Sequence, residues 1–196
     1  MSDAAREYLL ETARESAAIK DQFLKGYTDQ LVQAARWIGE CVNQGGKLLI
    51  FGNGGSAADA QHMAAEMVGR MLVERRPLPA IALTTDTSNL TAVGNDYGFD
   101  FVFQKQVEAL AQPQDVLLAI STSGNSKNVL AAVQAGQKRG CRVIALTGGT
   151  GGKLKEIADL ALVAELGKNS SRIQETHIFA VHSMVDLCDR FFLEKK

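Results

Sequence analysis

The sequence predicts an α/β protein, a three-layer α/β/α sandwich whose central parallel sheet has about five strands and is preceded by two N-terminal helices. Two observations support this fold class. Five apolar runs, each five or six residues long, follow one another after residue 46. Most end in glycine or small polar residues, a pattern typical of strands buried on both faces. Helix-like segments separate most of the runs, as the crossovers of a parallel sheet require.

The N-terminal region, residues 3–45, shows no strand pattern and is predicted to be helical. Its second part carries apolar residues on one helical face, whereas its first part has a weaker helical pattern. We therefore expect two helices in this region. The apolar face of the second helix consists of Leu31, Ala34, Ala35, Ile38 and Val42.

Strands and helices alternate along the rest of the chain. The apolar runs predict strands at residues 47–51, 79–83, 115–120, 141–146 and 159–163. Helical patterns predict helices at residues 56–71, 101–111 and 126–139, followed by a long closing helix at 173–192. The closing helix repeats apolar residues at helical spacing, so we expect it to pack on the sheet or on another subunit.

The length and composition fit a single domain spanning residues 1–196. A chain of 196 residues has the size of one ordinary domain of about 150 to 200 residues. Hydrophobic residues make up 46% and charged residues 22%, values that exclude a disordered chain. The formal net charge of -1 lacks the basic excess of a dedicated nucleic-acid or anionic-membrane binder, so we expect neither partner.

No feature of the sequence predicts insertion into a membrane or secretion. No apolar run approaches the ~20 residues that span a bilayer, and the first residues are too charged for a signal peptide. The three cysteines, Cys41, Cys141 and Cys188, are widely spaced and lack CxxC pairing. We therefore expect a cytoplasmic protein whose cysteines are small buried hydrophobes rather than disulfide or zinc-ribbon residues.

The loop after the third predicted strand has the composition of a phosphate site. Residues 121–126, Ser-Thr-Ser-Gly-Asn-Ser, gather four hydroxyls, a glycine and an amide just before a helix. Hydroxyl donors and the free N–H groups of a helix N-terminus suit a phosphate dianion. The alternative interpretation is that Ser126 is a helix N-cap and that the remaining residues form an ordinary turn.

The loop after the first predicted strand contains several glycines. Residues 52–57 match the dinucleotide pattern G-x-G-x-x-A, which calls for an acidic residue about 20 positions later, at the end of the second strand. Glu74 precedes that strand, and Asp86 lies more than 30 residues beyond Gly52. The absence of a suitably placed acid favours a sugar-phosphate pocket made by two loops over a nucleotide site.

The histidines and their neighbours suggest acid/base or metal chemistry. His62 and Glu66 are four residues apart and share one helix face, where they could bind a metal, act on a substrate or form a surface hydrogen bond. Gln174 and His182, eight residues apart, lie about 80° around a helix and about 12 Å along it. A buried Gln/His pair can also be satisfied within the core, and we expect His177 to be a packed or surface residue.

Four segments together resemble the sugar isomerase (SIS) domain family, and within it the phosphoheptose isomerases. These segments are GNGGSAADAQHMAAEMVGR at residues 52–70, Gly-Asn-Asp at 94–96, STSGNS at 121–126, and RIQETHIFAVH at 172–182. The resemblance covers nearly the whole chain, including the N-terminal helices and the closing helix.

The resemblance implies an aldose-ketose isomerase that converts sedoheptulose 7-phosphate to D-glycero-D-manno-heptose 7-phosphate through an enediol. This reaction is the first step of heptose biosynthesis for lipopolysaccharide or other surface sugars. The resemblance also implies a homotetramer with active sites at subunit interfaces, in which the helical segment 1–45 contributes to oligomerisation.

The resemblance further assigns roles to individual residues. It implies one zinc ion per subunit, and Glu66 and His182 as the catalytic pair, with Glu66 as base and His182 as acid. The implied zinc ligands are His62, Glu66, Gln174 and His182. The implied substrate-binding residues are Asn53, Gly54, Gly55, Glu66, Asn95, Asp96, Ser121, Thr122, Ser123, Ser126 and Gln174. Glutamine is an uncommon zinc ligand, so tight binding does not follow from this set.

Two other functions fit the same fold. One is that of a noncatalytic relative that binds the bacterial replication initiator; that relative lacks an acid at the position of Glu66 and a histidine at that of His182, and it alters the loop at 121–126. The present chain keeps all three features. The other is an isomerase or regulator acting on another phosphosugar, such as an amino-sugar phosphate. The four implied zinc ligands, however, resemble the ligand set of the heptose enzymes.

Two smaller features receive structural interpretations. We interpret the segment Glu74–Arg76 most simply as a solvated turn, with a basic contact to substrate from a neighbouring subunit as the alternative. Tyr97 and Phe99, which follow Asn95 and Asp96, are interpreted as packing aromatics.

Overall fold

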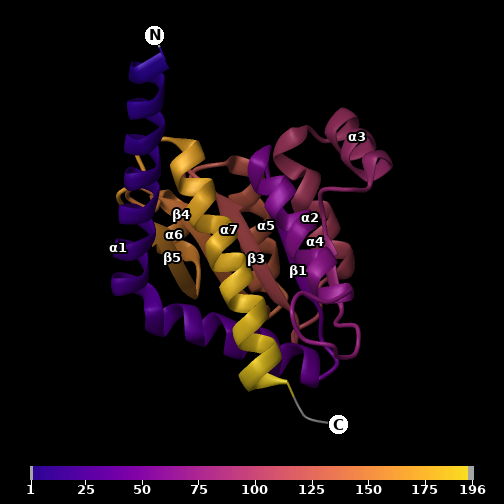
Figure 1. Ribbon diagram of the computed structural model, residues 1–196. Helices are drawn as coiled ribbons and strands as arrows, with labels where there is room; N and C mark the ends of the chain where they lie inside the picture. Colours follow the sequence, from indigo (N-terminus) through magenta and orange to yellow (C-terminus); the bar gives the residue numbers. More distant parts are fainter. Residues whose placement is uncertain (1, 194–196) are drawn as a thin grey trace.

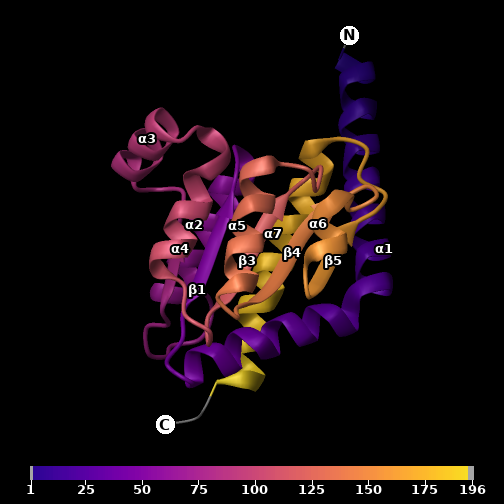
Figure 2. The same cartoon turned by 180° about the vertical axis from the view of Figure 1, so that it is seen from behind.

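The computed structural model describes residues 2–193 and contains a five-stranded parallel sheet between two layers of helices (Figures 1 and 2). The strands are β1 (Leu48–Gly52), β2 (Ala80–Ala82), β3 (Val116–Ser121), β4 (Arg142–Gly148) and β5 (Leu160–Ala164). Their order across the sheet is β2-β1-β3-β4-β5, and every neighbouring pair is parallel. The predicted fold class is therefore confirmed, and each predicted apolar run coincides with a strand to within one or two residues at its ends.

Both faces of the central strands are buried. All residues of β1 and β3 are buried, because alternate side chains enter two different hydrophobic clusters. Leu48 and Ile50 belong to the cluster on one face of the sheet, and Leu49 and Phe51 to the cluster on the other. Burial on both faces explains why these strands read as continuous apolar runs rather than alternating patterns.

The first helical layer consists of α1 (Ser2–Asn43), α2 (Gly55–Val68) and α7 (Ser170–Leu187), followed by a π-helical turn, η2 (Cys188–Phe192). Figure 1 shows α7 crossing this face between α1 and α2. Met63 of α2 and Met184 of α7 are fully buried in the same cluster. The packing of this cluster holds α2 and α7 side by side, which determines where their exposed side chains meet.

The second layer covers the opposite face, seen in Figure 2. It contains α3 (Thr87–Asp96), the short 3-10 helix η1 (Phe99–Phe101), α4 (Val102–Leu110), α5 (Lys127–Lys138) and α6 (Gly152–Ile157). The helices α3 and α6 were not predicted from the sequence. Asp86 begins α3 by accepting a hydrogen bond from the Asn89 backbone N–H at 3.0 Å, a standard N-cap.

The N-terminal helical region forms one kinked element. Tyr27 has φ -130° and ψ 16°, and Figure 1 shows the helix turning sharply between an upright first part and a second part that runs beneath the sheet. The hydroxyl of Tyr27 donates to Glu165 Oε1 at 2.6 Å, which ties the kink to the segment after β5. The helical prediction for residues 3–45 is confirmed, with the two predicted helices joined end to end at this kink.

The cysteines match their prediction. Cys41, Cys141 and Cys188 are buried and free, and burial raises the pKa of each thiol, to about 11, 11 and 12 respectively. Within residues 2–193, no helix combines the length and the apolar character needed to cross a bilayer.

Candidate active site

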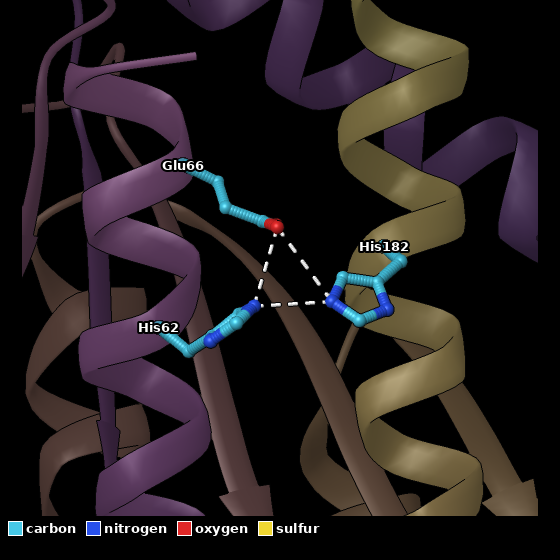
Figure 3. Close-up of side chains that lie close together, drawn as sticks. All are labelled: His62, Glu66 and His182. Carbon is cyan, nitrogen blue, oxygen red and sulfur yellow. Dashed lines mark hydrogen bonds and ion pairs between the residues drawn. The ribbon is translucent and has the colours of Figure 1, made fainter. Parts of the chain in front are cut away.

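Three predicted site residues meet between α2 and α7 (Figure 3). His62 Nε2 lies 3.2 Å from Glu66 Oε1 and 3.0 Å from His182 Nε2. His182 Nε2 is 3.6 Å from the same carboxylate oxygen. The helical spacing of four residues places His62 and Glu66 on one face of α2, and the packing of α7 brings His182, 120 residues beyond His62, to face them.

The carboxylate at the centre of this cluster is largely withdrawn from solvent. The side chain of Glu66 is 14% exposed, compared with 49% for His62 and 45% for His182. Its second oxygen, Oε2, is buried and has no hydrogen-bond partner among residues 2–193. A buried carboxylate oxygen without a partner is costly unless another group, such as a substrate or a metal, uses it.

The cluster has the composition of a metal site. Its two imidazole nitrogens and one carboxylate oxygen all lie within 4.8 Å of one another. Neutral imidazole and carboxylate are ordinary zinc ligands, and three protein ligands with an open position are typical of catalytic zinc. His62, Glu66 and His182 therefore fit a divalent metal, and the unpartnered Glu66 oxygen supports this fit.

Asp59 lies one turn before His62 on α2 and was missed in the sequence analysis. Its Oδ2 is buried without a partner in the described chain. Burial raises the pKa of this carboxyl to about 6, although the nearby imidazoles of His62 and His182 act in the opposite direction. The spacing of Asp59, His62 and Glu66 along one helix face was the available sequence signal.

Gln174 lies against the glycine loop. A side chain at Gly55 would overlap the amide of Gln174, so the absence of a Cβ lets α7 approach the start of α2. Gln174 lies on α7 about two turns before His182. Its predicted role as the fourth metal ligand stays a prediction.

The two predicted ligand loops lie next to each other at the carboxyl edge of the sheet. They follow β1 and β3, which are neighbours with Gly52 paired to Ile120. The side chain of Asn53 in the glycine loop exchanges two hydrogen bonds with Asn128 on the first turn of α5, each at 2.9 Å. Asn128 was not singled out from the sequence, where an asparagine early in a helix carries no distinctive signal.

The serine loop presents hydroxyls and helix N–H groups at the same place. Ser121 Oγ and Ser126 Oγ are 3.0 Å apart. Ser126 occupies the N-cap position of α5 but makes no side-chain capping hydrogen bond within the described chain. The alternative interpretation is therefore correct about the position of Ser126 but not about a side-chain cap. Val129 donates its N–H to Asn128 Oδ1, and the N–H groups before it in the first turn of α5 can serve an anion. Ser123 and Asn125 are the exposed members of this loop, and Thr122 is half-buried. Ser123 Oγ accepts a hydrogen bond from the Asn125 backbone N–H at 3.2 Å.

Asn95 and Asp96 lie elsewhere in the single chain. They occupy the last turn of α3, are exposed, and are joined by a hydrogen bond from Asn95 Nδ2 to Asp96 Oδ1 at 2.8 Å. Both views show α3 projecting from the edge of the molecule, away from α7 (Figures 1 and 2). One chain therefore places this predicted substrate-binding pair apart from the side chains that meet between α2 and α7.

The interpretation of residues 74–76 as a solvated turn is wrong for Arg75. Its side chain is 8% exposed and pairs with Asp189 at 2.9 Å. The guanidinium also donates to the backbone carbonyls of Glu66 and Met67, at 2.8 and 2.9 Å. These carbonyls belong to the last turn of α2, where helix geometry supplies no partner, so Arg75 closes that end of the helix.

Two further expectations are settled by burial. His177 is fully buried, its Nε2 lies 3.0 Å from the Thr147 carbonyl, and burial lowers its pKa to about 4; it is a packed residue, as predicted.

Tyr97 and Phe99 are 59% and 62% exposed, so their interpretation as packing aromatics is wrong.

Comparison with known proteins confirms the resemblance drawn from the motifs. The SIS domain model matches residues 13–148. The phosphoheptose isomerase of Aquifex aeolicus is 50% identical over 182 residues, covering 93% of this chain and 95% of that protein. The phosphoheptose isomerase of Nitratidesulfovibrio vulgaris (strain Miyazaki F) is 46% identical over 194 residues, covering 99% of this chain and 93% of that protein.

Solved structures agree with these relatives. The phosphoheptose isomerase GmhA from Neisseria gonorrhoeae superposes with a TM-score of 0.89 at 49% identity, covering 94% of this chain and 98% of that one. A phosphoheptose isomerase from Francisella tularensis gives a TM-score of 0.90 at 40% identity, covering 95% and 98%. The chain belongs to the SIS domain family, within the group that contains the phosphoheptose isomerases.

Proposed function

We propose that this protein is an aldose-ketose isomerase that converts sedoheptulose 7-phosphate to D-glycero-D-manno-heptose 7-phosphate. The observation that carries the proposal is the largely buried Glu66 side chain, whose Oε2 is buried without a partner among residues 2–193 and whose Oε1 faces His62 and His182. The relatives named phosphoheptose isomerase, matched along nearly the whole chain, give the substrate.

The reaction moves a carbonyl from C2 to C1 and needs one base and one acid. Glu66 removes a proton from C1, the carbon next to the ketone, and His182 gives a proton to the C2 oxygen, which forms the enediol. Loss of the C1 hydroxyl proton and return of a proton to C2 then give the aldose. The 3.6 Å separation of the two side chains allows both to reach adjacent atoms of one substrate.

The phosphate of the substrate fits the serine loop. Ser121, Thr122, Ser123 and Ser126 offer hydroxyl donors, and the uncapped start of α5 adds backbone N–H groups and the positive end of the helix dipole. The glycine loop, with Asn53, Gly54 and Gly55, lies beside this anion site, because it follows β1 and the serine loop follows the neighbouring β3. The phosphate would thereby fix the position of the sugar relative to the catalytic pair.

The proposed cofactor is one zinc ion per subunit, held by His62, Glu66 and His182 with Gln174 as the fourth ligand. The three convergent donor atoms support the first three assignments. When bound, the zinc would supply a Lewis acid that polarises the substrate carbonyl or stabilises the enediolate.

We also propose a cytoplasmic homotetramer with active sites at subunit interfaces, acting at the first step of heptose biosynthesis for lipopolysaccharide or other surface sugars. Two features of the chain support shared sites. The first part of α1 exposes apolar side chains, including Tyr8 at 72% and Leu9 at 65%, which favours a contact made by segment 1–45. In addition, Asn95 and Asp96 lie apart from Glu66 within one chain, so a neighbouring subunit would be needed to bring such a pair to a site.

The other two functions receive less support. A noncatalytic replication-initiator binder would have no use for a largely buried carboxylate that faces two imidazoles. Solved structures of proteins that act on or respond to other phosphosugars are similar to this chain at under 25% identity, for example the Vibrio vulnificus NanR protein at 16%, and this likeness extends to the fold alone.

The direct test is NMR detection of the aldose product from sedoheptulose 7-phosphate with Glu66→Gln and a matched control. Glu66→Gln keeps the side-chain volume but removes the base, so turnover should fall by about 10²–10⁴-fold. Glu74→Gln makes the same change at a side chain that is 83% exposed and should retain normal turnover. Near-normal turnover by Glu66→Gln would remove Glu66 from its assigned role.

The same assay tests the metal. A chelator should suppress product formation by the unmodified protein, and added zinc should restore it. Turnover that is unchanged by the chelator and by added zinc would leave the acid/base pair in place and remove zinc from the proposal. Absence of product under every metal condition would count against sedoheptulose 7-phosphate as the substrate.

A further inference from the structure

An amide pair, Asn53 and Asn128, connects the glycine loop to the start of α5. Each side chain donates its Nδ2 to the other's Oδ1 at 2.9 Å, and 75 residues separate them in the chain. Asn128 is 3% exposed, and its Oδ1 also accepts the Val129 backbone N–H at 2.9 Å. One buried side chain therefore joins the glycine loop to the helix that begins at the serine loop.

The pair is placed where it can control the geometry of both loops. Asn53 directly follows β1 and precedes α2, the helix that carries Glu66. Asn128 lies in the first turn of α5, immediately after Ser126 and Lys127. A shift of one loop relative to the other would break both amide hydrogen bonds, so the pair resists independent movement of the two loops.

A simple capping role does not account for Asn128. The N-cap position of α5 belongs to Ser126, and Asn128 directs both polar atoms of its amide toward Asn53. Burying two amides contributes little net stability compared with apolar packing, but a fully satisfied buried pair specifies one arrangement. The arrangement specified here is the position of the glycine loop relative to the start of α5, the helix that follows the serine loop.

We propose that Asn128 is a positioning residue, which holds Asn53 and the glycine loop in register with the phosphate-binding serine loop. This inference rests on the proposed isomerase function for its substrate. Asn128 acts through Asn53 and does not itself touch the reacting atoms. Without Asn128, the Asn53 amide loses both partners and the glycine loop is free to move relative to the bound phosphate.

A double-mutant cycle tests whether Asn128 acts through Asn53. Kinetics with sedoheptulose 7-phosphate are measured for Asn53→Ala, Asn128→Ala and the double variant. We expect each single variant to lower kcat/KM by about tenfold or more, mainly through KM, since the loss of partners leaves a misplaced or unsatisfied amide. The double variant should be no worse than Asn53→Ala within about twofold. Losses that multiply would overturn the proposal.

Two further variants guard against simple unfolding. Asn128→Asp keeps the volume and can still accept a hydrogen bond from Asn53 Nδ2, but it cannot donate to Asn53 Oδ1. It should fold normally and show the same rise in KM. Gln134→Ala changes an exposed amide on the same helix and should leave KM unchanged. If Asn128→Asp and Asn128→Ala both fold and both keep the KM of the unmodified protein, the positioning role is contradicted.

Hydrogen exchange gives a readout that does not depend on the substrate. In Asn128→Ala, but not in Gln134→Ala, amides of residues 53–58 should exchange faster, because Ser56 and Ala57 donate back to Asn53 and Gly54 within this loop. Unchanged exchange would overturn the proposal whatever the kinetics. The unmodified protein could fail to convert sedoheptulose 7-phosphate while Asn128→Ala still exchanges faster. That result would show that the loops are coupled and that the proposed substrate is wrong.

Discussion

His177 should make the protein lose stability as the pH falls below neutral. Its imidazole is completely buried and its Nε2 lies 3.0 Å from the Thr147 carbonyl, to which the neutral ring donates. Nδ1 has no partner in the described part of the chain. Burial lowers the pKa from 6.5 to about 4, so the unfolded chain takes up a proton at a pH where the folded chain does not.

The size of the effect follows from this pKa difference. Because the folded pKa is the lower one, the stabilisation is complete above pH 6.5 and is lost as the pH falls toward 4. Protonation of His177 in the unfolded state alone lowers the free energy of unfolding by about 2 kcal/mol between pH 7 and pH 5, and by about 3 kcal/mol between pH 7 and pH 4. This loss is a large fraction of the stability of an ordinary domain.

The variant His177→Gln isolates this contribution. Glutamine can donate a hydrogen bond to the Thr147 carbonyl but does not titrate. Urea unfolding at pH 7 and pH 5 measures the free energy of unfolding of both proteins, and all other titrating groups, including Asp59, are common to both. The unmodified protein should lose about 2 kcal/mol more than the variant over this interval. Equal losses in the two proteins would refute the argument from burial.

Two other substitutions test contacts around α2. Arg75→Ala should lower the free energy of unfolding by about 3–5 kcal/mol, because it leaves the buried carboxylate of Asp189 unpaired; denaturant unfolding measures this, and a loss below about 1 kcal/mol would contradict the assigned pairing. Gly55→Ala should displace the Gln174 amide and reduce turnover in a folded protein. Gly26→Ala, whose Cβ would meet nothing nearer than 3.8 Å, should keep normal turnover; equal turnover in both variants would show that the close approach at Gly55 is dispensable.

Local patterns predicted the fold well because the strands are buried on both faces. The continuous apolar run of β1 needs no knowledge of its neighbours, since every residue of that strand enters one core or the other. The pair of His62 and Glu66 was predictable for a similar reason, because helical spacing alone puts both on one face. The short α6 was missed because its six residues are too few to show a helical period.

Contacts between distant segments could not be predicted by spacing. The approach of His182 to Glu66 depends on how α7 packs against α2, and only the family resemblance linked them beforehand. Arg75 lies in a charged run that is typical of a solvated turn, yet Asp189, 114 residues away, accounts for its burial. Asn128 is likewise satisfied by a residue 75 positions earlier, so its own neighbourhood carries no sign of its role.

These long-range contacts share one physical effect, which is to fix both ends of α2. At its start, Asn53 is held by Asn128, and Gln174 packs against the backbone of Gly55. At its end, Arg75 binds the carbonyl of Glu66 and that of the following residue. Helix ends are where a helix frays most readily, and a displacement of about 1 Å in a catalytic group can cost about 10²-fold in rate. The restraints on α2 therefore act where movement of the proposed base relative to the substrate would be most damaging.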